Sequence, residues 1–180
     1  DLAEYFIISV PTPIEEINSV IKPNLKFVYD ALYSILPYIK KGNSIILEST
    51  CPVGTTKKIL SIICKETFLK EDDIFIAYCP ERVLPGNIIS ELQNNDRVIG
   101  GINKISSEKI KSLYERISLG QIYCTNSDIA ELVKIAENSY RDLNLAFANE
   151  LSIICDKLGI NSYELISLAN LSDIFSIKTS

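Results

Sequence analysis

The sequence predicts an α/β fold in which a partial, doubly wound parallel sheet is followed by a long helix and the start of a helical domain. Short β-like runs alternate with helical periodicity over residues 5–124, as in strands joined by crossover helices. The runs Phe6-Ile7-Ile8 and Ile45-Ile46-Leu47 are apolar at every position, which is typical of strands covered by helices on both faces. A continuous helical pattern then extends over about 128–158.

The expected elements follow in order along the chain. Pro11-Thr12-Pro13 ends the first strand, because proline cannot donate to a sheet ladder. Gly42 and Gly159 end helices, and Ser106 or Ser107 caps the start of another. The predicted strands cover residues 5–10, 44–48, 74–79, 97–101 and 121–124. The predicted helices cover about 25–39, a stretch after residue 54 that includes 59–63, then 106–117, 128–158 and 162–170.

The alternation of strands and helices ends near Thr125. We expect residues 1–125 to form the C-terminal half of a dinucleotide-binding domain, and residues 126–180 to form central helices that open a further domain. Such a binding domain normally begins with a strand, a GxGxxG turn and a helix, and no such motif occurs in this sequence. The first predicted strand is therefore expected to be a middle strand of a larger sheet, with an unpaired edge.

Composition excludes several classes of protein. The 180 residues are 47% apolar and 23% charged, which is near the globular average and argues against disorder. The net charge of 18 − 23 = −5 argues against a nucleic-acid partner. Because histidine is absent, Ser-His-Asp and Cys-His catalysis and a His-ligated metal are excluded within this chain. No apolar run approaches the roughly 20 residues that span a bilayer, so no membrane partner is expected.

The cysteines predict no disulfide framework and no zinc site. There are five of them, an odd number, they are scattered, and none forms a CxxC motif. We interpret them as small core residues of a protein in a reducing, cytoplasmic compartment. Their positions are 51, 64, 79, 124 and 155.

Three loops occupy the places where a ligand is expected. In open α/β sheets ligands bind beyond the carboxyl ends of the strands. Val10–Pro13, Glu48–Gly54 and Cys79–Gly86 follow the first three predicted strands, and each places hydroxyl or charged groups beside proline or glycine. For any one loop taken alone, ordinary loop chemistry and helix capping are the favoured interpretation. The stretch Gly54-Thr55-Thr56 is also a weak candidate for binding a phosphate at exposed helix N-terminal amides.

The third loop carries a more specific signal. Glu81 and Arg82 stand between two prolines after an apolar strand. Arg82 is suited to a forked contact with phosphate or carboxylate, and Glu81 to work as a general base or to position a water. A surface ion pair is the alternative interpretation.

The long predicted helix carries Lys134, Asn138 and Arg141 at positions i, i+4 and i+7, which share one face. A cation, an amide and a second cation in one stripe can hold an anion or a developing oxyanion, and a partly buried lysine can serve as a base. Because Glu131 and Glu137 lie nearby, a solvated polar face is the competing interpretation.

Several separate motifs together resemble the UDP-glucose/GDP-mannose dehydrogenase family. They are VPTP at 10–13, ESTCPVGTT at 48–56, AYCPERVLPGN at 77–87, NDRVIGG at 95–101, AELVKIAENSYRDLNLAFANELSIIC at 130–155 and GINSYELISLAN at 159–170. The resemblance covers about residues 5–170 in family order. The form PERVLPG is similar to the branch that oxidises N-acetylated UDP-sugars, in particular UDP-N-acetyl-D-mannosamine.

The resemblance implies an activity and roles for named residues. The family oxidises the C6 hydroxyl of a nucleotide sugar to a carboxylate in two hydride transfers to NAD, through a covalent cysteine intermediate. It implies that Lys134 is the general acid/base and that Asn138 helps it stabilise an oxyanion. Glu81 would assist proton transfer and thioester hydrolysis. The remaining implied contacts are Arg82, Val83 and Arg141 to the UDP-sugar, and Thr12 and Thr50 to NAD. A homodimer is the implied assembly, with the long helix at its interface.

The chain departs from the family pattern in ways that predict an internal fragment. The Gly-rich NAD turn is expected upstream and the nucleophilic cysteine downstream, and none of the five cysteines matches that nucleophile. We therefore expect no dehydrogenase activity from this polypeptide alone. The alternatives are a sibling enzyme for UDP-N-acetylglucosamine or UDP-glucose, a non-catalytic chain that binds nucleotide or pairs with an intact subunit, and a gene fragment without a function of its own.

Overall fold

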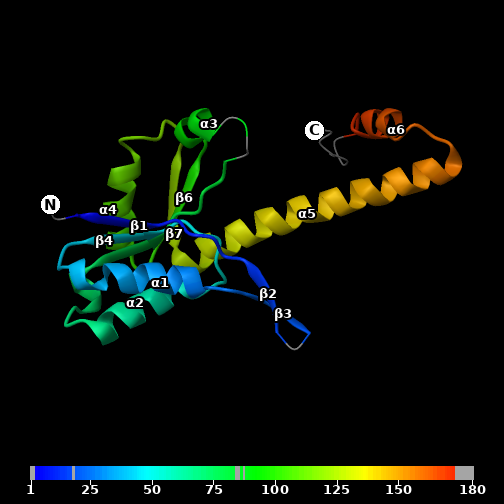
Figure 1. Cartoon of the computed structure of the whole chain (residues 1–180). Helices are drawn as coiled ribbons and strands as arrows, with labels where there is room; N and C mark the ends of the chain where they lie inside the picture. Colours follow the sequence, from blue (N-terminus) through cyan, green and yellow to red (C-terminus); the bar gives the residue numbers. More distant parts are fainter. Residues whose placement is uncertain (1–2, 18, 84–85, 87, 173–180) are drawn as a thin grey trace. The chain divides into compact units, whose positions relative to one another are not determined.

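The computed structural model describes residues 3–17, 19–83, 86 and 88–172 of the chain. Two compact units are present, residues 1–135 and 136–180, and Figure 1 labels their elements. The strands are β1 (Tyr5–Ile8), β2 (Ile14–Ile17), β3 (Val20–Pro23), β4 (Ser44–Leu47), β5 (Phe75–Tyr78), β6 (Arg97–Gly101) and β7 (Ile122–Asn126). The α-helices are α1 (Lys26–Ile35), α2 (Thr55–Glu66), α3 (Ile88–Asn94), α4 (Lys104–Tyr114), α5 (Ser127–Leu158) and α6 (Ser162–Ala169). Short 3-10 helices cover Leu36–Tyr38 and Glu71–Asp73.

The first unit is built on a five-stranded sheet in the order β1-β4-β5-β6-β7. Strands β1, β4 and β5 are parallel neighbours, with Ile7 opposite Ile46 and Ile46 opposite Ala77. Their carboxyl ends therefore lie at one edge of the sheet, as expected. Strand β1 forms the outer edge, since β4 is its only partner in the described part of the chain.

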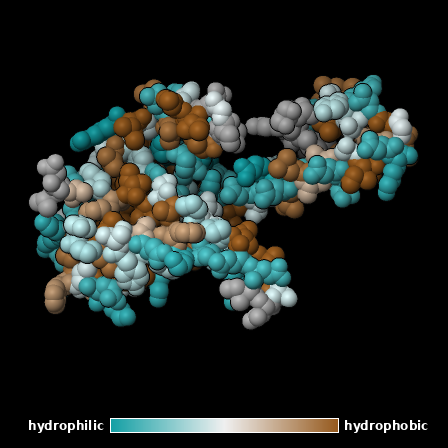
Figure 2. Space-filling view, viewed as in Figure 1, coloured by the Kyte–Doolittle hydropathy of each residue, from teal (hydrophilic) through white to brown (hydrophobic). Residues whose placement is uncertain are grey.

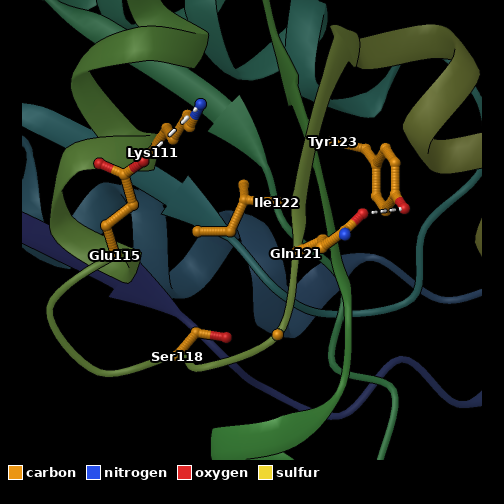
Figure 3. A pocket seen from close by; sticks show the side chains of 7 residues that line it. Lys111, Glu115, Ser118, Gln121, Ile122 and Tyr123 are labelled. Carbon is orange, nitrogen blue, oxygen red and sulfur yellow. Dashed lines mark hydrogen bonds and ion pairs between the residues drawn. The ribbon is translucent and has the colours of Figure 1, made fainter.

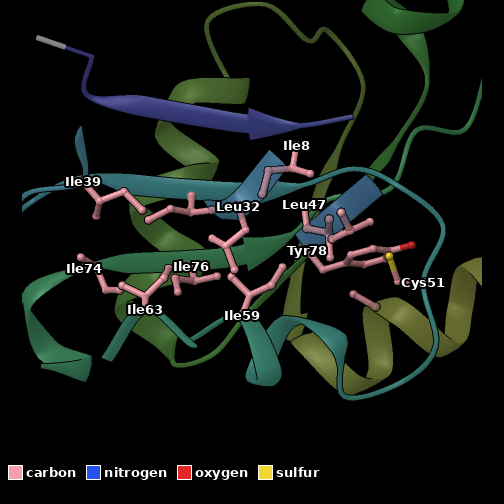
Figure 4. Close-up of a cluster of buried hydrophobic side chains, with 13 residues drawn as sticks. Ile8, Leu32, Ile39, Leu47, Cys51, Ile59, Ile63, Ile74, Ile76 and Tyr78 are labelled. Atoms are coloured by element: carbon pink, nitrogen blue, oxygen red, sulfur yellow. The ribbon is translucent and has the colours of Figure 1, made fainter. Parts of the chain in front are cut away.

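Helices cover both faces of this sheet, which confirms the predicted α/β class. Side chains alternate along the strands, so Ile45 and Leu47 face α1 and α2 while Ile46 faces α4. Figure 4 shows the first of these clusters, in which Leu32 and Ile59 point from their helices toward the strands. Burial on both faces explains why β4 is apolar at every position. The edge strand β1 was expected to be covered in the same way, but its Ile7 is 52% exposed.

Two strands, β6 and β7, run opposite to the expected direction. Strand β6 pairs with β5 antiparallel, with Tyr78 opposite Gly100, and β7 pairs parallel to β6. A parallel neighbour would require the chain to cross back over the sheet. Instead, the one helix among the described residues of this connection is the short α3. The Arg97 side chain at the start of β6 donates to the Leu92 carbonyl of α3 (2.9 Å). The chain thus turns back beside β5, and the sheet is mixed.

Three further details differ from the sequence prediction. The antiparallel hairpin of β2 and β3 follows the first proline-rich loop, where only a loop was expected. Helix α3 was not predicted either. Helix α4 begins earlier than expected, because Asn103 is its cap and accepts from the Ser106 N–H (2.8 Å). The hydroxyls of Ser106 and Ser107 instead bond to the strands, for example from the Gly101 N–H to Ser107 (2.9 Å).

The second unit consists of most of α5 and all of α6. Asn161 caps α6 by accepting from the N–H groups of Tyr163 and Glu164, and Cys155 and Ile166 are buried. Many large apolar side chains of this unit are exposed, and brown surface is visible along it in Figure 2. They include Leu143, Leu145, Phe147, Ile153, Ile154, Leu158, Ile160, Leu168 and Leu171. No helix of the described residues is long and apolar enough to cross a membrane.

Candidate active site

The loops that follow β1, β4 and β5 are joined directly. The Ser49 hydroxyl, just after β4, accepts from the Val10 N–H (2.8 Å) and donates to the Val10 carbonyl (2.7 Å). The Cys79 N–H, just after β5, donates to the Leu47 carbonyl (2.9 Å). Because these bonds extend the parallel ladder past the strand ends, the three predicted loops form one continuous edge.

Helix α5 returns to this edge with its first turns. The Nζ of Lys134 donates to the backbone carbonyl of Glu81 at 2.7 Å, and the lysine side chain is half-buried. The carboxylate of Glu81 accepts from the Arg82 N–H (2.6 Å), so this residue presents both a carbonyl and a carboxylate at the edge. The structure thus brings together two of the three predicted catalytic residues.

The side chain of Glu131 corrects two sequence interpretations. It is fully buried, so this part of α5 is no solvated polar face. Its carboxylate accepts from the N–H groups of Gly54 (2.6 Å) and Thr56 (2.8 Å) and from the Thr56 hydroxyl (2.7 Å). The prediction that the amides at the start of α2 are available to a phosphate is therefore wrong, because a carboxylate of the chain occupies them.

A buried charged cluster lies next to Glu81. Arg97 is buried, its Nη1 lies 4.0 Å from the Glu81 carboxylate, and its guanidinium stacks on the Tyr114 ring at 4.8 Å. The Tyr114 hydroxyl donates to the Glu48 carboxylate (2.6 Å). Sequence reasoning missed Arg97, Tyr114 and Glu48 as site residues. A charge at the first position of an apolar strand was the available signal for Arg97, since such a group is buried only with partners.

Burial raises the pKa of the Glu48 carboxyl, while the hydrogen bond from Tyr114 lowers it and the nearby Glu81 charge raises it further. Burial likewise raises the pKa of the Tyr114 phenol, which therefore stays protonated and remains a donor. A carboxyl whose pKa is raised by folding binds its proton more tightly in the folded state. The contribution of Glu48 to the free energy of unfolding is therefore fully present below its unfolded pKa. That contribution is lost as pH rises through the folded pKa.

We expect the substitution Glu48→Gln to stabilise the chain at neutral pH. Glutamine keeps an acceptor for Tyr114 and removes the charge that burial disfavours. The melting temperature of the variant minus that of the wild type should grow from acid to neutral pH, as measured by circular dichroism. The exposed control Glu108→Gln should show a smaller change with pH. A difference for Glu48→Gln that shrinks toward neutral pH would contradict the burial argument.

The other predicted site residues differ in placement. Arg82 lines a hollow of about 420 Å³ with Asn94, Asn95 and Asp96, and it donates to the Asp96 carbonyl (3.2 Å). Val83, Thr12 and Thr50 are half-buried in the three loops. Residues 84, 85 and 87 of the PERVLPGN motif lie outside the described residues. Asn138 and Arg141 lie further along α5, in the second unit.

The cysteines are free thiols, and three of them are buried. Burial raises the pKa of Cys51 to about 12 and that of Cys79 to about 11. Both thiols lie beside the candidate site, yet they are protonated at neutral pH and are therefore poor nucleophiles.

A second hollow lies away from the predicted residues. It measures about 390 Å³, and two pairs of the residues that line it bond to one another, as Figure 3 shows. Lys111 pairs with Glu115 (3.7 Å), and the Tyr123 hydroxyl donates to Gln121 (2.6 Å). None of the predicted site residues lines it.

Comparison with known proteins identifies the class that this fold and edge represent. Residues 1–118 match the NAD binding domain of the UDP-glucose/GDP-mannose dehydrogenase family, and residues 128–179 match its central domain. The chain belongs to this family, as the motif resemblance predicted.

Two curated relatives and one solved structure are similar to the chain over most of its length. The chain is 50% identical over 169 residues to the UDP-N-acetyl-D-mannosamine dehydrogenase of Methanococcus vannielii, which covers 93% of this chain and 38% of that protein. A Ralstonia solanacearum NDP-N-acetyl-D-galactosaminuronic acid dehydrogenase is 43% identical, with 93% and 41% covered. The UDP-D-ManNAc dehydrogenase structure from Pyrococcus horikoshii superposes with a TM-score of 0.92 at 37% identity, over 98% of this chain and 42% of that one. The chain spans about two fifths of the length of these relatives.

Proposed function

We propose that this chain supplies the C-terminal half of the NAD domain and the central helices of a UDP-N-acetyl-D-mannosamine 6-dehydrogenase. The enzyme oxidises the C6 hydroxyl of the sugar to a carboxylate in two hydride transfers. Family membership and the relatives acting on N-acetylated sugars support the substrate class. The observation that carries the proposal is the Lys134 ammonium at 2.7 Å from the Glu81 carbonyl, at the carboxyl edge of the sheet.

Lys134 is the proposed general acid/base. Its contact with the Glu81 carbonyl holds the amine at the sheet edge. An ammonium group, which carries three N–H donors, suits a sugar hydroxyl and the oxyanion that develops from it. Glu81 is proposed to assist proton transfer and hydrolysis of the thioester, and its carboxylate lies 4.0 Å from the Arg97 guanidinium.

The substrate contacts are proposed on two grounds. Arg82 lines a polar hollow, where its guanidinium suits a phosphate or carboxylate, and Val83 follows it in the same loop. Asn138 and Arg141 are assigned by family resemblance alone, Asn138 as an oxyanion donor and Arg141 as a contact to the UDP-sugar.

NAD is the proposed cofactor, and it accepts the hydride when bound. The loops after β1 and β4 carry the half-buried residues Thr12 and Thr50 at the carboxyl edge of the sheet, where α/β folds bind ligands, and this supports a cofactor site there. The N-terminus of α2 does not take part in holding its phosphates, because Glu131 occupies those amides.

A homodimer of the whole enzyme and a cytoplasmic location complete the proposal. The second unit exposes more large apolar side chains, such as Leu143 and Leu145, than the single scattered ones of an ordinary protein surface. Their number supports an interface there. The five free cysteines support a reducing compartment.

A hybrid enzyme tests this function. In it, the present chain replaces the matching segment of the Methanococcus vannielii relative, and that relative supplies the rest of the enzyme. We expect NADH formation from NAD and UDP-N-acetyl-D-mannosamine, followed by absorbance. Turnover with UDP-N-acetylglucosamine and UDP-glucose should be slower.

The chain by itself serves as the control and should form no NADH. A folded hybrid that binds UDP-sugar in calorimetry but forms no NADH would refute the proposal and favour a non-catalytic nucleotide-binding role. Faster turnover of another UDP-sugar would move the chain to a sibling enzyme.

A further inference from the structure

The carboxylate of Glu131 is the N-terminal cap of α2. The first N–H groups of a helix have no acceptor within it, and the residue before α2, Gly54, has no side chain to supply one. Glu131 supplies the acceptor from 75 to 77 residues away in the sequence. Its carboxylate accepts from the Gly54 N–H, the Thr56 N–H and the Thr56 hydroxyl at 2.6 to 2.8 Å. The partial positive charge at the helix N-terminus suits a buried carboxylate.

The same residue lies three positions before Lys134 on α5. Residues at i and i+3 lie on one side of a helix, roughly 4.5 Å apart along its axis. Fixing Glu131 therefore fixes both the rotation and the axial position at which the Lys134 side chain leaves the helix. Lys134 then reaches the Glu81 carbonyl at 2.7 Å. The first turns of α5 are thus held by two of the three loops of the candidate site.

We propose that Glu131 is a positioning residue for Lys134. It touches no reacting group. By capping α2 it holds α5 in the one register that places the ammonium against Glu81, and it joins the loop that carries the cofactor contact Thr50 to the helix that carries the acid/base. The inference rests on the function proposed above for Lys134.

Two substitutions separate this role from simple helix packing. Glu131→Gln preserves the shape of the side chain but replaces one acceptor oxygen by an NH₂ group that faces N–H donors, so the cap fails without leaving a cavity. Asp128→Asn is the matched control. Asp128 pairs with Lys57 at 2.5 Å between the same two helices, but the pair is partly exposed and such pairs contribute little.

The test measures the acetylation rate of Lys134 by peptide mass spectrometry, with the exposed Lys104 as internal reference. The loss of one charge-assisted hydrogen bond corresponds to roughly a tenfold change in protection. We expect Lys134 in Glu131→Gln to react about tenfold faster than in the wild type, and Lys134 in Asp128→Asn to react at the wild-type rate. In the hybrid enzyme, Glu131→Gln should lower kcat about tenfold and leave KM for the UDP-sugar within about twofold.

An unchanged Lys134 rate in Glu131→Gln, in a chain whose circular dichroism matches the wild type, overturns the inference. So does an equal rise in Asp128→Asn. If Glu131→Gln does not fold, Thr56→Val carries the test, because it removes only the hydroxyl donor and should give a smaller rise. The acetylation rate needs no turnover, so an inactive wild-type hybrid would refute the proposed function while this measurement still decides the role of Glu131.

Discussion

Replacing Lys134 by alanine should lower kcat of the hybrid enzyme by a factor of about 10²–10³ or more, because proton transfer and oxyanion stabilisation each contribute on that scale. The substitution removes the only ammonium that the described structure places on the Glu81 carbonyl. The rate of NADH formation at saturating UDP-N-acetyl-D-mannosamine is the measurement. The exposed Lys104→Ala should retain full activity. A near-normal rate for Lys134→Ala would remove this lysine from the chemistry.

The variant Lys134→Arg separates the two contributions. Arginine keeps a positive charge and hydrogen-bond donors but does not release its proton near neutral pH. If Lys134 works mainly as a base, the arginine variant should be nearly as slow as the alanine variant. An arginine variant close to wild type would show that the charge alone is required.

Replacing Gly100 by alanine should destabilise the first unit by about 3 kcal/mol, the upper part of the range for overpacking. A Cβ on Gly100 would lie 2.5 Å from the Ala130 Cβ and 2.5 Å from the Asn126 carbonyl oxygen. The second of these is backbone at the end of β7 and cannot rotate away, so β6 must separate from the junction between β7 and α5. Urea unfolding followed by circular dichroism measures the loss.

Two further variants control this unfolding experiment, one at an exposed position and one that relieves part of the predicted clash. Ser61→Ala, at an exposed position of α2, should change the unfolding free energy by less than about 0.5 kcal/mol. Adding Ala130→Gly to the Gly100 variant removes one of the two contacts and should recover only part of the loss. Full stability in Gly100→Ala would show that β6 and α5 are not in tight contact.

The sequence predicted the elements more completely than their directions and partners. The apolar runs located β4 and β5 because burial on both faces leaves a local signature, and the same kind of run located the edge strand β1, although its Ile7 is half-exposed. The long pattern located α5 to within a residue at each end. The antiparallel entry of β6 was not predictable from that pattern. Strand direction depends on whether the preceding connection crosses the sheet, and periodicity does not report that.

The candidate site shows the same division. Local chemistry singled out Glu81 and Lys134, because a charged pair between prolines and a cation on a helical stripe are unusual on their own. Local chemistry placed Glu131 on a solvated face, whereas its side chain is buried. Its partners at the start of α2 lie 75 to 77 residues away in sequence. A glutamate on a helix usually faces water, and only the approach of another helix N-terminus makes its burial favourable.

By itself, then, the amino-acid order determined the class of fold, the loops at the strand ends and the family. Hydrophobic periodicity and short motifs are local, and each is readable from neighbouring residues. Only the tertiary structure decided which carboxylate caps α2, how Arg97 and Tyr114 surround Glu48, and that the Lys134 ammonium meets the Glu81 carbonyl. Those pairings depend on the distances between segments that are far apart in the chain. Tertiary packing determines these distances, and the local sequence does not.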